Sequence, residues 1–222
     1  MTFIAYRPRP VLEERLAASA KQVVREIYRR SSLVRSQIQV DIPLCDLILG
    51  SRLRASNFQM VLEQVLYHQP DRHITRTFTL AVDELTMKKM QEMRLEAGND
   101  AGLALASSVK LRNGEEGHFP LMDFRCRRTR QNLSKIASFF AAHGSHLPPM
   151  GCILDSQRSY HFYGLSVLSR TAWVEFLGEC LLLGPLADSR YIAHCLLHGK
   201  ASLRITGSPR HRNVPIISAL VS

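Results

Sequence analysis

The second half of the chain repeats one arrangement, in which two short strands joined by a turn precede a helix. "LALASSVKLR" and "HFPLMDFRC" read as strands around the turn "NGEEG", and "RRTRQNLSKIASFFAAHG" follows as a helix. "GCILDSQ" and "SYHFYGLSVL" form a second strand pair, followed by the helices "SRTAWVEFLGECLLL" and "DSRYIAHCLLHG" and the last strands "ASLRIT" and "VPIISALV". This order predicts an α+β fold: a mainly antiparallel sheet with helices on one face and the other face open.

Residues 1–100 show a different pattern, and we expect a mostly helical N-terminal region before an α+β core over residues 101–222. Apolar spacing predicts helices over 11–30 and 56–67, a short helix in "DIPLCDLILG", and a helix in "VDELTMKKMQEMRLEAG". Clean alternation predicts a strand in "HITRTFTLAV". Three methionines at helical spacing should lie in the core rather than at a cofactor: Met87, Met90 and Met93.

The composition limits the class of protein and of partner. A hydrophobic content of 45% and a charged content of 22% are ordinary globular values, which argues against chain-wide disorder. The formal charge of +10 favours nucleic acid, a nucleotide or another polyanion as partner, although a basic solvated surface is the alternative. The first ten residues resemble no signal peptide, and no run of about 18 apolar residues occurs. We therefore expect a cytoplasmic protein without a membrane partner.

Several kinds of catalytic or metal site are excluded by missing patterns. The five cysteines are widely spaced and lack a zinc-binding arrangement. The chain has neither the GxxxxGK[ST] pattern of a P-loop nor the GxGxxG pattern of a dinucleotide-binding fold. It also lacks the G-x-S-x-G turn that presents a nucleophilic serine in many hydrolases.

Polar residues on the expected strands are the candidates for chemistry. Asp123 lies in an apolar strand, where a carboxylate is costly unless it is paired, hydrated or bound to metal. His161 stands among aromatic residues, and Arg204 alternates with two apolar neighbours, so its head needs a partner. Together with a basic loop that contains Arg210 and Arg212, these groups resemble a site for a nucleoside triphosphate and its divalent cation. The alternatives are a surface ion pair for the aspartate and a hydrogen-bonded structural role for the histidine.

The order of elements and three local segments resemble the archaeo-eukaryotic primase superfamily, the primase–polymerases. "MDFRC" is similar to the strand that carries metal-binding carboxylates, and "SQRSYHFYG" is similar to the turn that leads into a nucleotide-contacting histidine. "ADSRYIAH" lies where a third acid is sought, and "ASLRITGSPRHRNVP" resembles the closing basic segment. The resemblance covers 103–222, about half the chain.

The resemblance implies a role for each matching position. Asp123 would be catalytic and a ligand of Mg²⁺ or Mn²⁺, and Asp188 would be the third acid at the same metal site. His161 would be catalytic and would contact the nucleotide together with Ser159, and Arg204 would grip phosphate. The residues expected to contact nucleic acid are Arg127, Arg128, Arg210 and Arg212.

The chain departs from the family pattern at Arg125, which stands where a second carboxylate of the metal-binding pair is expected. Two-metal phosphoryl transfer needs several negative ligands, and a neighbouring arginine opposes them. Two functions therefore stay open. The chain is either a primase-like nucleotidyltransferase, weak or dependent on a protein partner for missing parts, or a degenerate relative that binds nucleotide or nucleic acid without turnover. The second would serve a replication, mobile-element or defence system.

Overall fold

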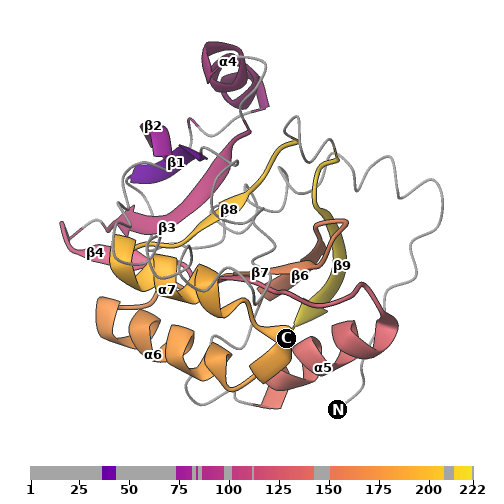
Figure 1. The fold of residues 1–222 in the computed structure, drawn as a ribbon. Coiled ribbons are helices and arrows are strands. Elements are labelled where there is room, and N and C mark those ends of the chain that lie inside the picture. The colour runs from indigo at the N-terminus through magenta and orange to yellow at the C-terminus, as the bar shows by residue number, and fades with distance from the viewer. Residues whose placement is uncertain are drawn as a thin grey trace, which may run out of the picture.

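The computed structural model of the chain describes residues 37–43, 74–81, 84, 87–97, 102–111, 113–142, 151–207 and 213–221 (Figure 1). Two antiparallel sheets and four α-helices make up these residues, so the expected α+β fold is confirmed. The first sheet has the order β2-β1-β3-β4, with β8 also paired to β3. Its strands are β1 (Gln37–Pro43), β2 (Ile74–Ala81), β3 (Ala104–Lys110), β4 (Glu116–His118) and β8 (Ser202–Arg204).

The second sheet has the order β5-β7-β6-β9 and carries the candidate residues Asp123 and His161. Its strands are β5 (Leu121–Asp123), β6 (Gly151–Asp155), β7 (Tyr160–Gly164) and β9 (Ile216–Val221). The helices are α4 (Met87–Ala97), α5 (Arg130–Ala142), α6 (Arg170–Leu181) and α7 (Ser189–His198), with the short 3₁₀ turn η4 (Gly184–Leu186) between the last two.

Aromatic rings hold α5 and α6 against one face of the second sheet. Phe162 of β7 stacks on Phe140 of α5 with ring centroids 3.8 Å apart. The ring centroid of Phe176 of α6 lies 6.4 Å from that of Phe162. All three side chains are fully or almost fully buried. Figure 1 shows both helices below this sheet. Alternation along β7 therefore sends Phe162 to the helices and His161 to the opposite face.

Pro120 divides the segment "HFPLMDFRC", which we expected to form one strand. β4 pairs with β3 in the first sheet, and β5 pairs with β7 in the second. Proline lacks the N–H that a ladder needs, but its carbonyl accepts a hydrogen bond from Gly164 N at 2.8 Å. The chain thus changes sheets at this residue, and the change places Asp123 beside His161.

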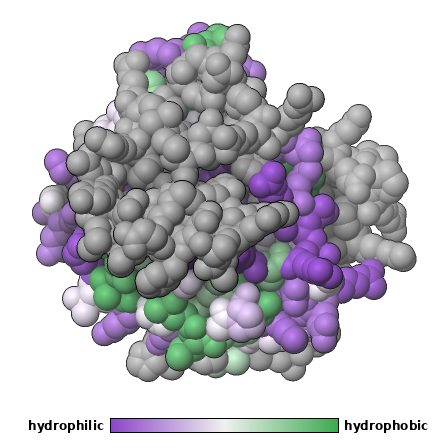
Figure 2. Space-filling view, in the orientation of Figure 1, coloured by the Kyte–Doolittle hydropathy of each residue, from purple (hydrophilic) through white to green (hydrophobic). Residues whose placement is uncertain are grey.

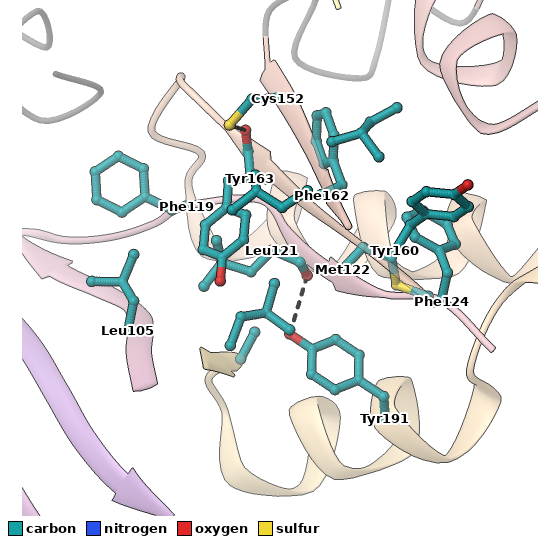
Figure 3. Close-up of a cluster of buried hydrophobic side chains, with 14 of the residues drawn as sticks. Leu105, Phe119, Leu121, Met122, Phe124, Cys152, Tyr160, Phe162, Tyr163 and Tyr191 are labelled. Carbon is teal, nitrogen blue, oxygen red and sulfur yellow. Dashed lines mark hydrogen bonds between the residues drawn. The ribbon is translucent and has the colours of Figure 1, made fainter. Parts of the chain in front are cut away.

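The second face of this sheet is covered, so the expectation of an open face is wrong. All five residues of β7 are buried. The hydroxyl of Tyr163 donates to the carbonyl of Arg204 in β8 at 3.1 Å, and the hydroxyl of Tyr191 in α7 donates to the carbonyl of Leu121 at 3.4 Å (Figure 3). The first sheet and α7 therefore close over the face that carries His161.

The N-terminal part of the chain adds two strands to the first sheet. β2 and α4 confirm the expected strand in "HITRTFTLAV" and the helix after it, and Met90 and Met93 are buried in the core. β1 was not expected, because residues 37–40 were assigned to no element and residues 41–43 were expected to begin a short helix. The helices expected over 11–30 and 56–67 lie outside the described residues. β1 pairs with β3, and the boundary at residue 100 stays a prediction.

No helix in the described ranges is long and apolar enough to cross a membrane.

The outer surface of α6 and α7 carries several exposed apolar side chains, and Figure 2 shows a hydrophobic patch where these helices lie. Its residues are Val174, Leu181, Leu182, Leu196 and Leu197. Gly178 lies on α6, and a Cβ at this position would meet no atom within 4 Å.

Two glycines provide a matched test of this packing. Gly178→Ala should stabilise the protein by up to about 1 kcal/mol, because alanine favours the helix and has free space there. Gly151→Ala should destabilise it, because the new Cβ would lie 2.3 Å from the ring of Phe162, which Phe140 holds in place. Chemical denaturation of both variants measures the two free energies of unfolding. Equal effects would contradict the described environments of α6 and β6.

Candidate active site

Asp123 and His161 face each other on neighbouring strands. They are directly opposite in the β5–β7 ladder, and His161 Nε2 lies 3.4 Å from Asp123 Oδ1. The side chains are 8% exposed for the histidine and 19% exposed for the aspartate. At this separation the contact is longer than a good hydrogen bond, so a ligand can replace it at low cost. The structure therefore places these two predicted site residues side by side, and their chemical roles stay predictions.

The start of α7 brings a second carboxylate to the end of β5. The backbone N–H of Asp188 donates to the carbonyl of Asp123 at 3.3 Å. The Asp188 side chain caps α7 and accepts hydrogen bonds from the N–H groups of Arg190 at 3.0 Å and Tyr191 at 3.2 Å. Both bonds end on Oδ1, which is the usual geometry of an N-cap. Within the described part of the chain, Oδ2 of Asp188 accepts no protein hydrogen bond, so this carboxylate caps the helix with one oxygen and leaves the other open.

Burial and like charge make Asp123 hard to ionise. Burial, and after it the negative charge of Asp188, raise the pKa of this carboxyl from 3.8 to about 8. A hydrogen bond from the backbone of Phe124 and the positive charge of Arg204 lower the pKa in part. At neutral pH, Asp123 therefore holds its proton most of the time when no cation is bound. A cation that binds here displaces that proton.

Ser159 shapes the turn before β7. Its hydroxyl accepts a hydrogen bond from the backbone N–H of Cys126 at 3.0 Å, and its own N–H donates to the hydroxyl of Ser156 at 3.2 Å. The first bond joins the turn to the segment that follows β5. The Ser159 side chain therefore helps to fix the strand that carries Asp123 relative to the strand that carries His161. Its expected contact with a nucleotide stays a prediction.

Arg204 lies on β8 and reaches the same region from the first sheet. Its Nη1 donates to the carbonyl groups of Thr206 at 2.8 Å and Asn213 at 2.7 Å. Its Nη2 lies 3.5 Å from the carbonyl of Ser156. The guanidinium thus contacts main-chain oxygens of three segments and also lowers the pKa of Asp123 through its charge.

The expected nucleic-acid contacts differ in their surroundings. Arg127 is exposed, whereas Arg128 forms an ion pair with Asp155, with 2.7 Å between Nη2 and Oδ2. Arg125 is also exposed, and among the described residues Asp123 contacts His161 and forms no ion pair with this arginine. The surface ion pair between Asp123 and Arg125 that the sequence left open is therefore absent. Arg210 and Arg212 lie outside the described residues.

The acidic groups suit one divalent cation better than two. Within the described ranges, no group of three or more His, Cys, Asp or Glu side chains is arranged to hold a metal ion. Mg²⁺ is commonly bound by one or two carboxylates, with water and substrate phosphates as its other ligands. Asp123 and the open oxygen of Asp188 fit that pattern. Asp155, the acid at the end of β6, is paired with Arg128.

Two tyrosines at the site were not expected from the sequence. Tyr163 lies two residues after His161 on the same face of β7, and its hydroxyl contacts Arg204. Strand alternation could have identified it. Tyr191 hydrogen-bonds to β5 from α7, and only the packing of that helix against the strand reveals the contact.

The raised pKa of Asp123 predicts a pH-dependent cost to stability. Between pH 3.8 and about 8 the unfolded chain loses this proton while the folded chain keeps it. Stability therefore falls as pH rises through this range, by at most about 1.4 kcal/mol per pH unit. Asp123→Asn cannot ionise and should become progressively more stable than wild type from pH 4 to pH 8.

Urea denaturation at several pH values measures this difference. Asp188→Asn is the matched variant, because asparagine keeps the helix cap but removes the charge that raises the pKa of Asp123. It should recover part of the same stability. Wild type and Asp123→Asn that lose stability in parallel would show that this carboxyl ionises normally in the folded protein.

Comparison with known proteins identifies the family. Residues 81–216, more than half of the chain, match the archaeo-eukaryotic primase 1D-like family. No curated protein and no solved structure matches the chain. The matched range includes the paired strands that carry Asp123 and His161 and the helix capped by Asp188. The resemblance stated from the sequence is confirmed, and the chain belongs to the archaeo-eukaryotic primase 1D-like family.

Proposed function

We propose that the chain is a primase-like nucleotidyltransferase that binds a nucleoside triphosphate with one Mg²⁺ or Mn²⁺ ion. The observation that carries this proposal is that Asp188 bonds the main chain of Asp123 and acts on its carboxyl through charge, while His161 contacts the same carboxyl. In such a transfer, a 3′-hydroxyl forms a bond to the α-phosphorus while the bond to pyrophosphate breaks. A divalent cation at the two carboxylates would supply charge stabilisation for the phosphate oxygens.

The residues of the chain would divide the work as follows. Asp123 and the open oxygen of Asp188 would hold the cation. His161 lies against Asp123 and would donate from Nε2 to a phosphate oxygen when the carboxylate turns to the metal. The exposed Arg125 lies just beyond β5, close to these groups in the chain, and adds positive charge for a polyanionic substrate. The proposed activity is weak or depends on a protein partner, because two carboxylates suit one cation and not two.

Calorimetry tests metal and nucleotide binding together. Wild type should bind a nucleoside triphosphate in the presence of Mn²⁺, and Asp123→Asn and Asp188→Asn should each weaken binding at least about tenfold. Because Asp123 is protonated at neutral pH, binding should release a proton. The measured enthalpy should therefore depend on the ionisation enthalpy of the buffer in wild type, and less so in Asp123→Asn. Equal metal-free binding by all three proteins would contradict the proposed site.

A second candidate function is binding of nucleic acid or nucleotide without turnover, as an accessory to a replication, mobile-element or defence system. Arg125 in place of an acid and the lack of a three-ligand metal cluster among the described residues favour it. Exposed arginines also surround the start of α5, and Figure 2 shows hydrophilic surface on the side where that helix begins. These residues are Arg125, Arg127, Arg130 and Arg158.

The salt dependence of nucleic-acid binding tests this surface. Arg127→Ala should weaken binding of a single-stranded oligonucleotide and should lower the slope of log K against log salt by about one unit or less. Lys88→Ala removes the same charge from α4, which lies far from α5 in Figure 1, and should leave the slope unchanged. Fluorescence anisotropy measured from about 50 to 200 mM salt gives the affinity and the salt slope of both variants. An identical loss in the two variants would mean that only net charge matters.

A further inference from the structure

Arg204 connects three segments that are far apart in the sequence. Its Nη1 bonds the carbonyl groups of Thr206 and Asn213, which lie before and after residues 208–212. Its Nη2 approaches the carbonyl of Ser156 in the turn between β6 and β7. Its own carbonyl accepts the hydrogen bond of Tyr163 from β7. One side chain and its main chain therefore link β8, the segment before β9, and the hairpin that carries His161.

The turn that Arg204 contacts has an uncommon backbone conformation. Gln157 has φ of 74°, in the left-handed region that non-glycine residues rarely adopt. Three contacts hold it there: its N–H donates to Asp155 Oδ1 at 2.6 Å, its carbonyl accepts from Arg128 Nη1 at 3.2 Å, and its side-chain Oε1 accepts from Asn213 Nδ2. Arg204 contacts two residues next to Gln157. It bonds the carbonyl of Asn213, whose side chain bonds Gln157, and it approaches the carbonyl of Ser156, which precedes Gln157 in the chain.

The conformation of this turn sets the position of the active-site pair. Ser159 ends the turn and bonds the N–H of Cys126, three residues after Asp123. The carbonyl of Tyr160, directly before His161, accepts from the N–H of Phe124, directly after Asp123, at 3.0 Å. A shift of the turn would therefore move β7 against β5 and change the contact between Asp123 and His161.

We infer that Arg204 is a positioning residue, which holds the β6–β7 turn and thereby the geometry of Asp123 and His161. The inference rests on the proposed function for its consequence, since the geometry matters to nucleotide binding. It assigns the guanidinium to main-chain carbonyl groups, whereas the family resemblance implies a grip on phosphate. The two roles differ in what the arginine does before any nucleotide is present.

Hydrogen exchange of the ligand-free protein separates these roles. Arg204→Met should speed amide exchange in residues 156–161 by about tenfold or more, because it removes the contact with the Ser156 carbonyl and the bond to Asn213, whose side chain bonds Gln157. Arg204→Lys keeps the charge but cannot bridge the same carbonyl groups, so it should show most of the same increase. Arg158→Met is the control on the same turn, because its side chain is exposed, and it should leave exchange unchanged. Unchanged exchange in both Arg204 variants would overturn the inference.

Ligand binding gives the second readout. If Arg204 acts by positioning, Arg204→Lys should lose affinity by a similar factor for a nucleoside monophosphate and for the triphosphate, both with Mn²⁺. A loss that grows with each added phosphate would assign the arginine to phosphate contact and overturn the inference. Faster exchange with unchanged affinity would do so as well, since the turn would then have no effect on the site. If wild type binds no nucleotide, the proposed function fails, while the exchange result still decides whether Arg204 holds the turn. If Arg204→Met does not fold, Arg204→Lys carries both measurements.

Discussion

β5 ends in an aspartate whose carboxyl group is held between a histidine, a second aspartate and the start of a helix. Burial in this place opposes ionisation, and the nearby charge of Asp188 opposes it further. The folded protein keeps this carboxyl group neutral. Above pH 3.8, the ordinary pKa of an aspartate, this lowers the free energy of unfolding. Such a cost is typical of sites where a ligand, and not the fold, completes the surroundings of a charged group.

The rest of the architecture follows from the way the chain reaches this strand. Pro120 ends pairing with the first sheet, and β5 then enters the second sheet beside β7. That change of sheet brings the two sheets together, so Tyr163 of β7 can hydrogen-bond to Arg204 of β8. The aromatic stack of Phe162 on Phe140 fixes the opposite face of β7. The strand that carries His161 is thus held by aromatic packing on one face and by the hydrogen bond of Tyr163 on the other.

Local patterns in the sequence predicted the elements well and their mutual arrangement less well. Alternation and turn residues identify β2, β3, β6 to β9 and the helices α4 to α7, because these signals depend on a few neighbouring residues. The same signals cannot tell that Pro120 divides a strand between two sheets, or that the face of His161 is covered. Both depend on contacts across more than 40 residues, such as that between Tyr163 and Arg204.

The candidate residues show the same limit. The occurrence of Asp123, His161 and Arg204 on neighbouring strands was sufficient to predict that they lie in one region. Chemical roles require knowledge of the partners. Arg204 looked free to bind phosphate because its strand neighbours are apolar, yet its guanidinium contacts carbonyl groups of Thr206 and Asn213. Asp188 looked like a third acid, and its carboxylate serves first as the cap of α7.

Charge balance argues that metal and nucleotide should bind together. Asp123 and Asp188 supply at most two negative charges, and Arg125, Arg204 and His161 lie near them in the chain or in space. A divalent cation alone meets a protonated carboxyl group and neighbouring positive charge, which weakens its binding. A triphosphate alone would meet the negative charge of Asp188, which repels it. If the two bind together, the phosphate oxygens would supply ligands for the cation and the cation would offset their charge, so each ligand would remove the obstacle to the other.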